Sequence, residues 1–354
     1  MIKYELRVSC GNSYMKTITK GKNMNNFKKV GLTALAGSLA AISAQAAEMS
    51  VNGATMLTYT SEHSSETTGN PFGMKTNLGF TASGEVNGYT VSYMQTSVDQ
   101  FAGMSSARLS VDMGDMGTIA FDQGSGSGLA TIDDKTPTAA EEIWDGLDGL
   151  TVGGLVGAAG NSGVFNYKQT YAGVAFNGAI RKGSGTKNAD GASSGAGQGA
   201  WDFALTTDGS AMGIDGVTIG GGYGEAEAGA GNAGSDKNEH STLFANYSVG
   251  PVTFGAQVSK IDNGASTATD ENAQAWGISF NVNENLSVSY GERDVEYDND
   301  TAADVTENGE GIAVAYTMGS MKIAGNRNEV SNNNNATGTA AEDYMTEIAV
   351  SFAF

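Results

Sequence analysis

The sequence predicts an all-β protein, a transmembrane antiparallel β-barrel of 16 strands with a long third loop folded into its lumen. Three observations lead to this prediction. A signal-peptide pattern precedes residue 47, no later segment is long and apolar enough for a spanning helix, and short alternating strands recur up to the last residue. A chain of this kind can cross a membrane only as a closed barrel, because lipid offers no partners for unpaired backbone groups.

The first 46 residues are interpreted as a leader outside the fold. Residues 24–46 read MNNFKKVGLTALAGSLAAISAQA, with a basic pair, an apolar stretch and a small-residue cleavage site, which is the layout of a secretory signal peptide. The apolar stretch has about 13 residues, fewer than the roughly 20 that a spanning helix needs. We therefore expect a signal peptide at 24–46 and a single barrel domain at 47–354. Residues 1–23 precede a complete signal, and we interpret them as an over-called start without a structural role.

The mature segment is strongly acidic and lacks cysteine. Residues 47–354 keep 12 basic residues (19 less 7) and 38 acidic residues (39 less 1), a formal charge of −26. The single cysteine, Cys10, precedes the signal, so neither a disulfide framework nor thiol chemistry is expected in the mature protein. The acidic balance excludes a nucleic-acid partner, which would require a basic surface.

Short strands, separated in turn by tight turns and long polar loops, fill the mature segment. The phrases GYTVSY, GTIAF, GVAF, GVTIG, PVTFGA, NLSVSY and SMKIAG each follow a turn with alternating apolar positions. Eight loops of the long kind imply eight hairpins and therefore 16 strands. These loops are expected near residues 61–72, 99–103, 124–161, 182–199, 227–240, 262–272, 297–308 and 331–342.

The tail, TEIAVSFAF, is expected to be the strand that closes the barrel on the first one. Its residues alternate between an apolar, aromatic face and a small, mostly polar face, which is the period of a strand. Chain termini of soluble domains usually fray, so a terminal strand this regular indicates a paired one. We assign to its outer face Tyr344, Ile348, Val350, Phe352 and Phe354, with Phe354 in the aromatic girdle at the membrane boundary.

Together these features resemble the Gram-negative general (diffusion) porins. Residues 164–180, VFNYKQTYAGVAFNGAI, are similar to the strand-turn-strand that follows the third loop in porins of the alphaproteobacterial type. The resemblance covers the mature chain. It implies a protein exported to the bacterial outer membrane, usually a homotrimer, with the third loop folded into the lumen of a sixteen-stranded barrel.

The third loop, residues 124–161, is the main candidate functional segment. Folded into a pore, it would place negative charge where a solute is most confined. Thr138 and Glu141 match a capping box, so a short helical turn is expected there. The alternative is an extracellular acidic loop that its charge keeps soluble. Against one lysine, Lys135, the loop carries six carboxylates: Asp133, Asp134, Glu141, Glu142, Asp145 and Asp148.

Basic residues are expected on the opposing wall. With Leu109 and Val111 facing outward, Arg108 and Lys168 face inward, and Arg181 at the top of the seventh strand is a weaker candidate. Opposed charges across a narrow gap would orient dipolar solutes and slow apolar ones. The acidic loop and the charge of −26 make cation preference a hypothesis.

Other candidate sites have weaker support in the sequence. Residues 294–307, DVEYDNDTAADVTE, are rich in carboxylates but lack the spacing of an EF-hand. We therefore predict a solvated loop and no metal or cofactor site. The alternative is weakly bound calcium that bridges acidic loops to lipopolysaccharide. His63 and His240 lie far apart in expected outer loops, and no Ser-His-Asp arrangement has local support, so no enzymatic activity is expected. Outward-facing Gly53 and Gly178 are compatible with the packing of protomers in a trimer.

Two functions from different classes remain. The first is a passive, water-filled channel for small hydrophilic solutes and ions, surrounded by outer-membrane lipid and lipopolysaccharide. The second is an interaction protein, an adhesin or receptor, that acts through its extracellular loops. Such a protein needs large loops, yet the longest after the third spans only about 20 residues.

Overall fold

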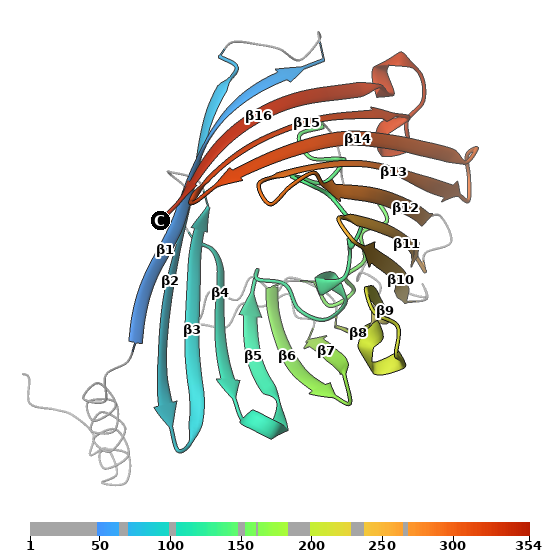
Figure 1. Ribbon diagram of the computed structural model, residues 1–354. Helices are drawn as coiled ribbons and strands as arrows, with labels where there is room; N and C mark the ends of the chain where they lie inside the picture. The colour runs from blue at the N-terminus through green and yellow to red at the C-terminus, as the bar shows by residue number, and fades with distance from the viewer. Residues whose placement is uncertain are drawn as a thin grey trace, which may run out of the picture. The chain divides into compact units, whose positions relative to one another are not determined.

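The computed structural model shows sixteen antiparallel strands joined into one closed barrel (Figure 1). The signal peptide and the over-called start expected in residues 1–46 lie outside the described residues and stay predictions. Within the described ranges, no helix is long and apolar enough to cross a membrane. The structure describes residues 48–63, 70–98, 104–147, 153–160, 162–182, 199–227, 237–264 and 268–354.

Each strand pairs with its neighbours in sequence order, and the sixteenth pairs with the first. This topology confirms the predicted strand number and fold class. The strands are β1 (Glu48–Glu62), β2 (Phe72–Val86), β3 (Tyr89–Val98), β4 (Met104–Asp112), β5 (Thr118–Gln123), β6 (Ser162–Tyr171), β7 (Val174–Arg181), β8 (Ala200–Asp208), β9 (Val217–Ala226), β10 (Asn238–Val249), β11 (Val252–Asp262), β12 (Thr269–Asn281), β13 (Leu286–Asn299), β14 (Val305–Met318), β15 (Met321–Ser331) and β16 (Asp343–Ala353).

Tight turns join the strands at one rim of the barrel. β2 and β3 are connected through Asn87 and Gly88, with φ of 53° and 83°, and β6 and β7 through Ala172 and Gly173, with φ of 51° and 81°. Positive φ at both central residues gives the hairpin turn whose twist matches that of the paired strands. Such turns fix the register, and the register decides which face of each strand points outward.

The last residue of the chain is hydrogen-bonded to the first strand. The Phe354 N–H donates to the Gly53 carbonyl, and the Gly53 N–H donates to the Phe354 carbonyl, both at 2.9 Å. Nine further residue pairs join β16 to β1 in antiparallel register. The predicted closing strand is therefore confirmed, and β16 leaves no free edge, as a sheet surrounded by lipid requires.

The outer wall of the barrel is apolar. Ile348 and Phe352 on β16, and Phe354 directly after it, expose 52%, 45% and 67% of their surface. Tyr344 and Val350 on the same face are half-buried. Outward-facing aliphatic and aromatic side chains continue round the other strands. An apolar exterior around a polar interior is the reverse of a soluble barrel and suits a wall surrounded by lipid.

Aromatic rings of the same chain occupy the space beside both outward glycines. A Cβ at Gly53 would lie 3.1 Å from the ring of Phe354, and a Cβ at Gly178 would lie 2.7 Å from the ring of Phe176. Each glycine therefore leaves room for an aromatic ring that packs over it on the outer wall. Aromatic side chains pack over glycine in the same way in other sheets. The space at each is already filled within the protomer.

We expect adjacent substitutions on β4 to differ in cost because their side chains face different solvents. Leu109 is 49% exposed toward lipid, near the middle of the strand, whereas Ser110 faces the lumen. Leu109→Arg should lower the free energy of unfolding by about 2–4 kcal/mol, and Ser110→Arg by clearly less. Equilibrium unfolding in denaturant, with the protein folded into phosphocholine vesicles, measures both, and equal losses would contradict the assignment of faces.

Candidate functional site

The third loop lies inside the barrel. β5 ends at Gln123 and β6 begins at Ser162, so the loop occupies residues 124–161, as predicted. In Figure 1 the green segment between these strands enters the ring and follows its inner wall. Inward-pointing polar side chains of the wall hold the backbone of the loop, namely Asn177, Asp202, Asn246, Gln257, Ser289 and Asn328.

Asp202, on β8, is hydrogen-bonded to both limbs of the loop, the outgoing one at Leu129 and the returning one at Ala159. Its Oδ1 accepts from the Leu129 N–H at 3.1 Å and its Oδ2 accepts from the Ala159 N–H at 2.8 Å. The residue is only 2% exposed. A Cβ at Gly128, where φ is 60°, would lie 1.8 Å from Asp202 Oδ1, so the loop can pass this carboxylate only with glycine there.

The middle of the loop is held by amide side chains of β10 and β11. The Lys135 N–H donates to Gln257 Oε1 at 2.7 Å, and Gln257 Nε2 donates to the carbonyls of Ile132 and Asp133 at 2.8 and 3.0 Å. Asn246 Nδ2 donates to the Lys135 carbonyl at 2.8 Å. Amides that both donate and accept can satisfy an irregular backbone in this way.

The second half of the loop lies against β13 and β15. The Ala139 N–H donates to Ser289 Oγ at 2.8 Å. Asn328 Nδ2 donates to the carbonyls of Glu142 and Asp145 at 3.1 and 2.9 Å. Together with the contacts to β8, β10 and β11, these bonds hold the loop around roughly half of the barrel circumference.

Apolar residues of the loop bury themselves against the wall. The buried apolar residues of this protein therefore lie largely between the third loop and the inner face of the strands. One cluster joins loop residues to β8, β10 and β11, and it contains Leu129, Ile132, Val156, Ala204, Phe244 and Ile261. A second joins the loop to β15 and β16, and it contains Leu147, Val330 and Met345.

The helical turn expected at Thr138 does not form, and that prediction was wrong. A capping box requires the hydroxyl to accept from the N–H of residue 141. Instead, Thr138 Oγ1 donates to the Glu141 carbonyl at 2.6 Å and accepts from the Ala140 N–H at 3.3 Å. The loop makes a single turn only further on, where the Asp145 N–H donates to the Glu142 carbonyl at 3.0 Å. Asn328 on the wall also binds the carbonyls of Glu142 and Asp145, so tertiary contacts decide the path of this segment over its local propensity.

The loop carboxylates separate into two groups. Asp133 and Asp134 line a small cavity beside Arg293, under the loop. The second group, which lies toward β16, comprises Glu141, Glu142 and Asp145. Asp148, the sixth predicted carboxylate, lies outside the described residues, and its role stays a prediction.

Burial and mutual repulsion raise the pKa of loop carboxyls. Burial raises the pKa of Asp133 above its ordinary value of 3.8, despite the nearby Lys135. Burial, then the negative charges of Glu141 and Glu142, raise the pKa of Asp145 above the same value. As the pH falls, both carboxyls therefore become neutral earlier than an ordinary aspartate.

Two charged residues near this group were missed from the sequence. Lys75 on β2 and Glu347 on β16 both act electrostatically on Asp145. Each lies at an inward position next to an exposed apolar residue, Met74 and Ile348 respectively. Extending the alternation pattern to every strand would have found them.

Arg108 faces the lumen from β4, but a buried carboxylate offsets its charge. Its Nη2 donates to Ser127 Oγ at 3.0 Å and to Asn166 Oδ1 at 2.9 Å, and it lies 3.8 Å from Asp122 Oδ2. Asp122 is fully buried and also accepts from the Ser127 hydroxyl at 2.6 Å. The cluster joins the start of the loop to β4, β5 and β6.

Lys168 and Arg181 also face the lumen, from β6 and β7. Lys168 lines a cavity below the loop. Arg181 approaches the end of the loop, where a Cβ at Gly160 would lie 2.9 Å from its Nη1. The role of Arg108, Lys168 and Arg181 as a basic pore wall stays a prediction.

A further inward cation, Arg293 on β13, was not anticipated. It is 5% exposed, lies 3.7 Å from Glu307 Oε1, and stacks on the Trp144 ring of the loop at 4.9 Å from the centroid. A guanidinium over an aromatic ring is an attractive contact, especially when shielded from water. Arg293 thus fastens the loop to the wall, and Glu307 offsets its charge.

The segment expected to be an acidic, potentially calcium-binding loop is mostly strand. Of residues 294–307, only 300–304 lie between β13 and β14. Strand alternation sends its carboxylates to opposite faces: Asp294 points outward, whereas Glu307 points inward to Arg293. In the part of the chain that the structure describes, no group of three or more His, Cys, Asp or Glu could hold a metal ion.

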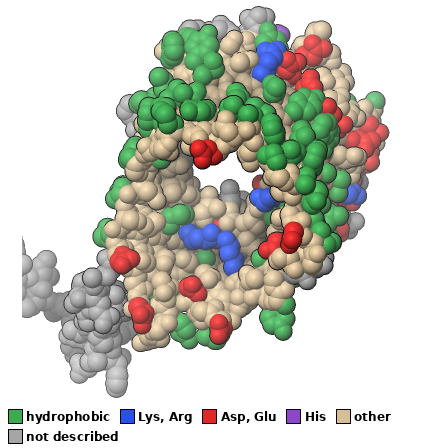
Figure 2. Space-filling view, in the orientation of Figure 1, with side chains coloured by type: hydrophobic (Ala, Val, Ile, Leu, Met, Phe, Trp, Pro, Cys, Tyr) green, Lys and Arg blue, Asp and Glu red, His purple; other side chains and the backbone are tan. Residues whose placement is uncertain are grey.

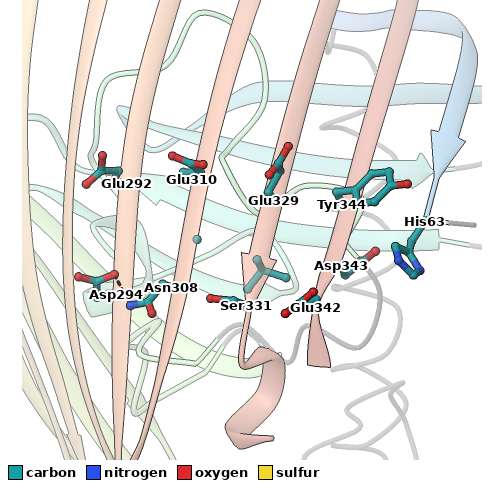
Figure 3. Close-up of a pocket in the computed structure, with 12 residues that line it drawn as sticks. His63, Glu292, Asp294, Asn308, Glu310, Glu329, Ser331, Glu342, Asp343 and Tyr344 are labelled. Atoms are coloured by element: carbon teal, nitrogen blue, oxygen red, sulfur yellow. Dashed lines mark hydrogen bonds between the residues drawn. The ribbon is translucent and has the colours of Figure 1, made fainter. Parts of the chain in front are cut away.

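Outward carboxylates of β13–β15 line a shallow pocket near the rim of the long loops (Figure 3). The pocket has a volume of about 370 Å³. Glu292, Glu310 and Glu329 lie side by side on the three strands, and Tyr344 and His63 close one end. This pocket lies on the outer surface of the barrel, so its charges are separated from the lumen by the wall.

An opening passes through the barrel beside the third loop (Figure 2). In this view an acidic patch lies at the upper edge of the opening, and basic patches lie at its right and lower edges. The second acidic group of the loop lies against β13–β16, while the three predicted basic residues lie on β4–β7. In a ring of sixteen strands these two sectors are roughly opposite.

A family model described as Gram-negative porin matches residues 31–335 of the chain. The chain belongs to the Gram-negative porin family. This porin is therefore a protein of the bacterial outer membrane, as the sequence predicted. The alphaproteobacterial type stays a prediction.

Several solved structures share the fold of this porin. OmpTdeltaL8, a loop-deletion mutant of an outer membrane protein of Vibrio cholerae, has a TM-score of 0.64 at 15% identity, covering 87% of this chain and 100% of that one. OmpF of Salmonella typhi, in complex with daunomycin, has a TM-score of 0.62 at 13% identity, covering 88% of this chain and 99% of that one. The anion-selective porin from Comamonas acidovorans has a TM-score of 0.61 at 14% identity, covering 87% of this chain and 100% of that one. No curated protein sequence matches the chain.

We expect Asp202 to control the seating of the loop. Asp202→Ala would leave the buried N–H groups of Leu129 and Ala159 without partners, at roughly 1–3 kcal/mol each. The matched variant, Asp202→Asn, keeps one acceptor oxygen and should recover about half of that loss. Denaturant unfolding measures the difference, and single-channel current should become noisier in the alanine variant. Equal stability of all three proteins would show that this carboxylate does not anchor the loop.

Proposed function

We propose that this porin is a passive channel for small hydrophilic solutes and ions, with a preference for cations. The observation that carries the proposal is the path of the third loop, which is fastened along the inner wall and leaves an opening beside it (Figure 2). A loop held this way narrows the passage without sealing it. The polar lumen favours hydrated solutes, because an apolar solute would displace water from charged groups there.

The balance of fixed charges supports the cation preference. Arg108 and Arg293 each lie near a buried carboxylate, Asp122 and Glu307 respectively, so the field of these two cations is largely cancelled. Within the described residues no ion pair neutralises the second acidic group of the loop, Glu141, Glu142 and Asp145. Fixed negative charge in a confined passage raises the local concentration of cations.

We also propose a homotrimer surrounded by lipid and lipopolysaccharide. The trimer is supported by the family and by the trimer form of Vibrio cholerae OmpT, which has the same fold. Contact with lipid is supported by the apolar outer wall. At its loop-side edge, Trp276 Nε1 donates to Glu292 Oε2 at 3.2 Å, an arrangement in which an aromatic body meets lipid and its polar tip meets the headgroups.

The alternative function, an adhesin or receptor, receives less support. The longest loop of the chain lies inside the barrel and is held there by several strands. It therefore adds little to an outer binding surface. We accordingly favour the channel.

Removing charge from the second acidic group should reduce the cation preference. We expect Glu141→Gln with Asp145→Asn to shift the reversal potential under a salt gradient toward zero, because two fixed negative charges leave the passage. Asp294→Asn is the matched control, since it removes a carboxylate from the outer wall and should leave the potential unchanged. An unchanged potential in the double variant, or an equal shift in the control, would contradict the assignment.

The cation preference should also weaken as the pH falls. The pKa of Asp133 and Asp145 is raised above 3.8, so these groups lose their charge at a higher pH than an ordinary aspartate does. We expect the reversal potential to begin moving toward zero before the pH reaches the ordinary aspartate range. In the variant that lacks the carboxylates of residues 141 and 145, this early part of the titration should be smaller.

A further inference from the structure

A cavity of about 410 Å³ opens off the lumen beneath the third loop. Residues of β5–β8 form its wall; most of them face inward, and Gln169 and Phe176 also contribute. Loop residues 131, 132 and 135 line the cavity as well. Gly114 and Gly117 of the turn between β4 and β5 also line it, so the cavity lies toward the rim of the short turns. Its volume falls in the range of about 300–1,000 Å³ that is usual for small-molecule sites.

Two ammonium groups and no carboxylate line this cavity. Lys168 faces it from β6, beside its register partner Thr118 on β5. Lys135 faces it from the loop, and its backbone is held on both sides by Gln257 and Asn246 at 2.7 and 2.8 Å. Side chains of β10 and β11 thus fix the backbone position from which the Lys135 side chain extends. Neither lysine forms an ion pair with another residue of the described ranges.

The nearby carboxylates are engaged elsewhere. Asp122 acts on Lys168, but it is fully buried, accepts from Ser127 and lies next to Arg108, whose positive charge opposes its effect. Asp133 is close to Lys135 in sequence, yet it lines the separate cavity beside Arg293. The cavity is therefore locally positive, within a lumen whose main loop is acidic.

Hydroxyl groups complete the lining. Those of Thr118, Thr170 and Thr206 form no hydrogen bond with other described residues, so they are available to a solute. Thr131 and Asn177 are already bonded to each other, with Asn177 Nδ2 donating to Thr131 Oγ1 at 3.1 Å, and they form a fixed part of the wall. Free hydroxyls both donate and accept, which suits the hydroxyls of a polyol or sugar.

We propose that this cavity binds small polyhydroxylated solutes that carry one oxyanion group, a carboxylate or a phosphomonoester. Lys135 and Lys168 bind the oxyanion through charge-assisted hydrogen bonds, and the threonine hydroxyls bind the hydroxyls of the solute. This inference deepens the proposed function and rests on it for access through the lumen. The acidic loop of the channel repels anions in general. The cavity would nevertheless retain one particular class of anionic solute within the same lumen.

The test is equilibrium binding by calorimetry, at low salt, with the mature protein folded in detergent. The probes are glucose 6-phosphate and gluconate, with glucose and inorganic phosphate as partial ligands. We expect both oxyanionic sugars to bind, and Lys135→Gln and Lys168→Gln each to weaken binding roughly tenfold. Lys75→Gln is the matched control, since it removes a lysine that does not line the cavity, and it should change binding less than twofold. Heat-modifiable migration in gels confirms that each variant is folded.

Each outcome decides the inference. Binding of only one oxyanionic sugar identifies the oxyanion class and supports the site. Absence of binding by both, or binding that survives both glutamine substitutions, overturns it, and inorganic phosphate binding as tightly as glucose 6-phosphate overturns the role of the hydroxyls. Conductance in potassium chloride, measured on the same preparations, separates the two proposals. A conducting channel without binding leaves the proposed function intact, and binding without conductance refutes the channel alone.

Discussion

The pairing of Phe354 with Gly53 is the interaction on which the rest of this structure depends. In a lipid environment every backbone N–H and C=O must find a partner within the protein, and an open sheet would leave two unpaired edges. The bonds between β16 and β1 remove both edges at once. Closure also creates an inside and an outside, so the alternation of each strand becomes an apolar wall toward lipid and a polar wall toward water.

The third loop makes use of that enclosed polar wall. Its irregular backbone has many groups without partners of their own, and the inward amides and carboxylates of the wall supply them. Because most of these bonds run from a wall side chain to the loop backbone, they hold the path of the loop while leaving several of its own side chains free. Asp202 is the clearest case, since one buried carboxylate holds both limbs.

The sign of the charge in the lumen differs from one region to the next. Arg108 and Arg293 do structural work beside buried carboxylates, and they contribute less to the passage than their number suggests. The second acidic group of the loop, Glu141, Glu142 and Asp145, lies on the side of β13–β16. Below the loop, Lys135 and Lys168 make a positive cavity within the same lumen. A net charge of −20 for the chain therefore describes neither region.

The sequence by itself determined the number of strands, their outward faces, the closing strand and the limits of the third loop, because periodicity and turn residues are local properties that each strand carries on its own. Only the tertiary structure decided the path of the loop. Asp202 and Leu129 lie 73 residues apart, and Asn328 and Glu142 lie 186 apart. No periodic pattern marks such partners. The same contacts replaced the helical turn expected at Thr138 and decided which carboxylates gather together.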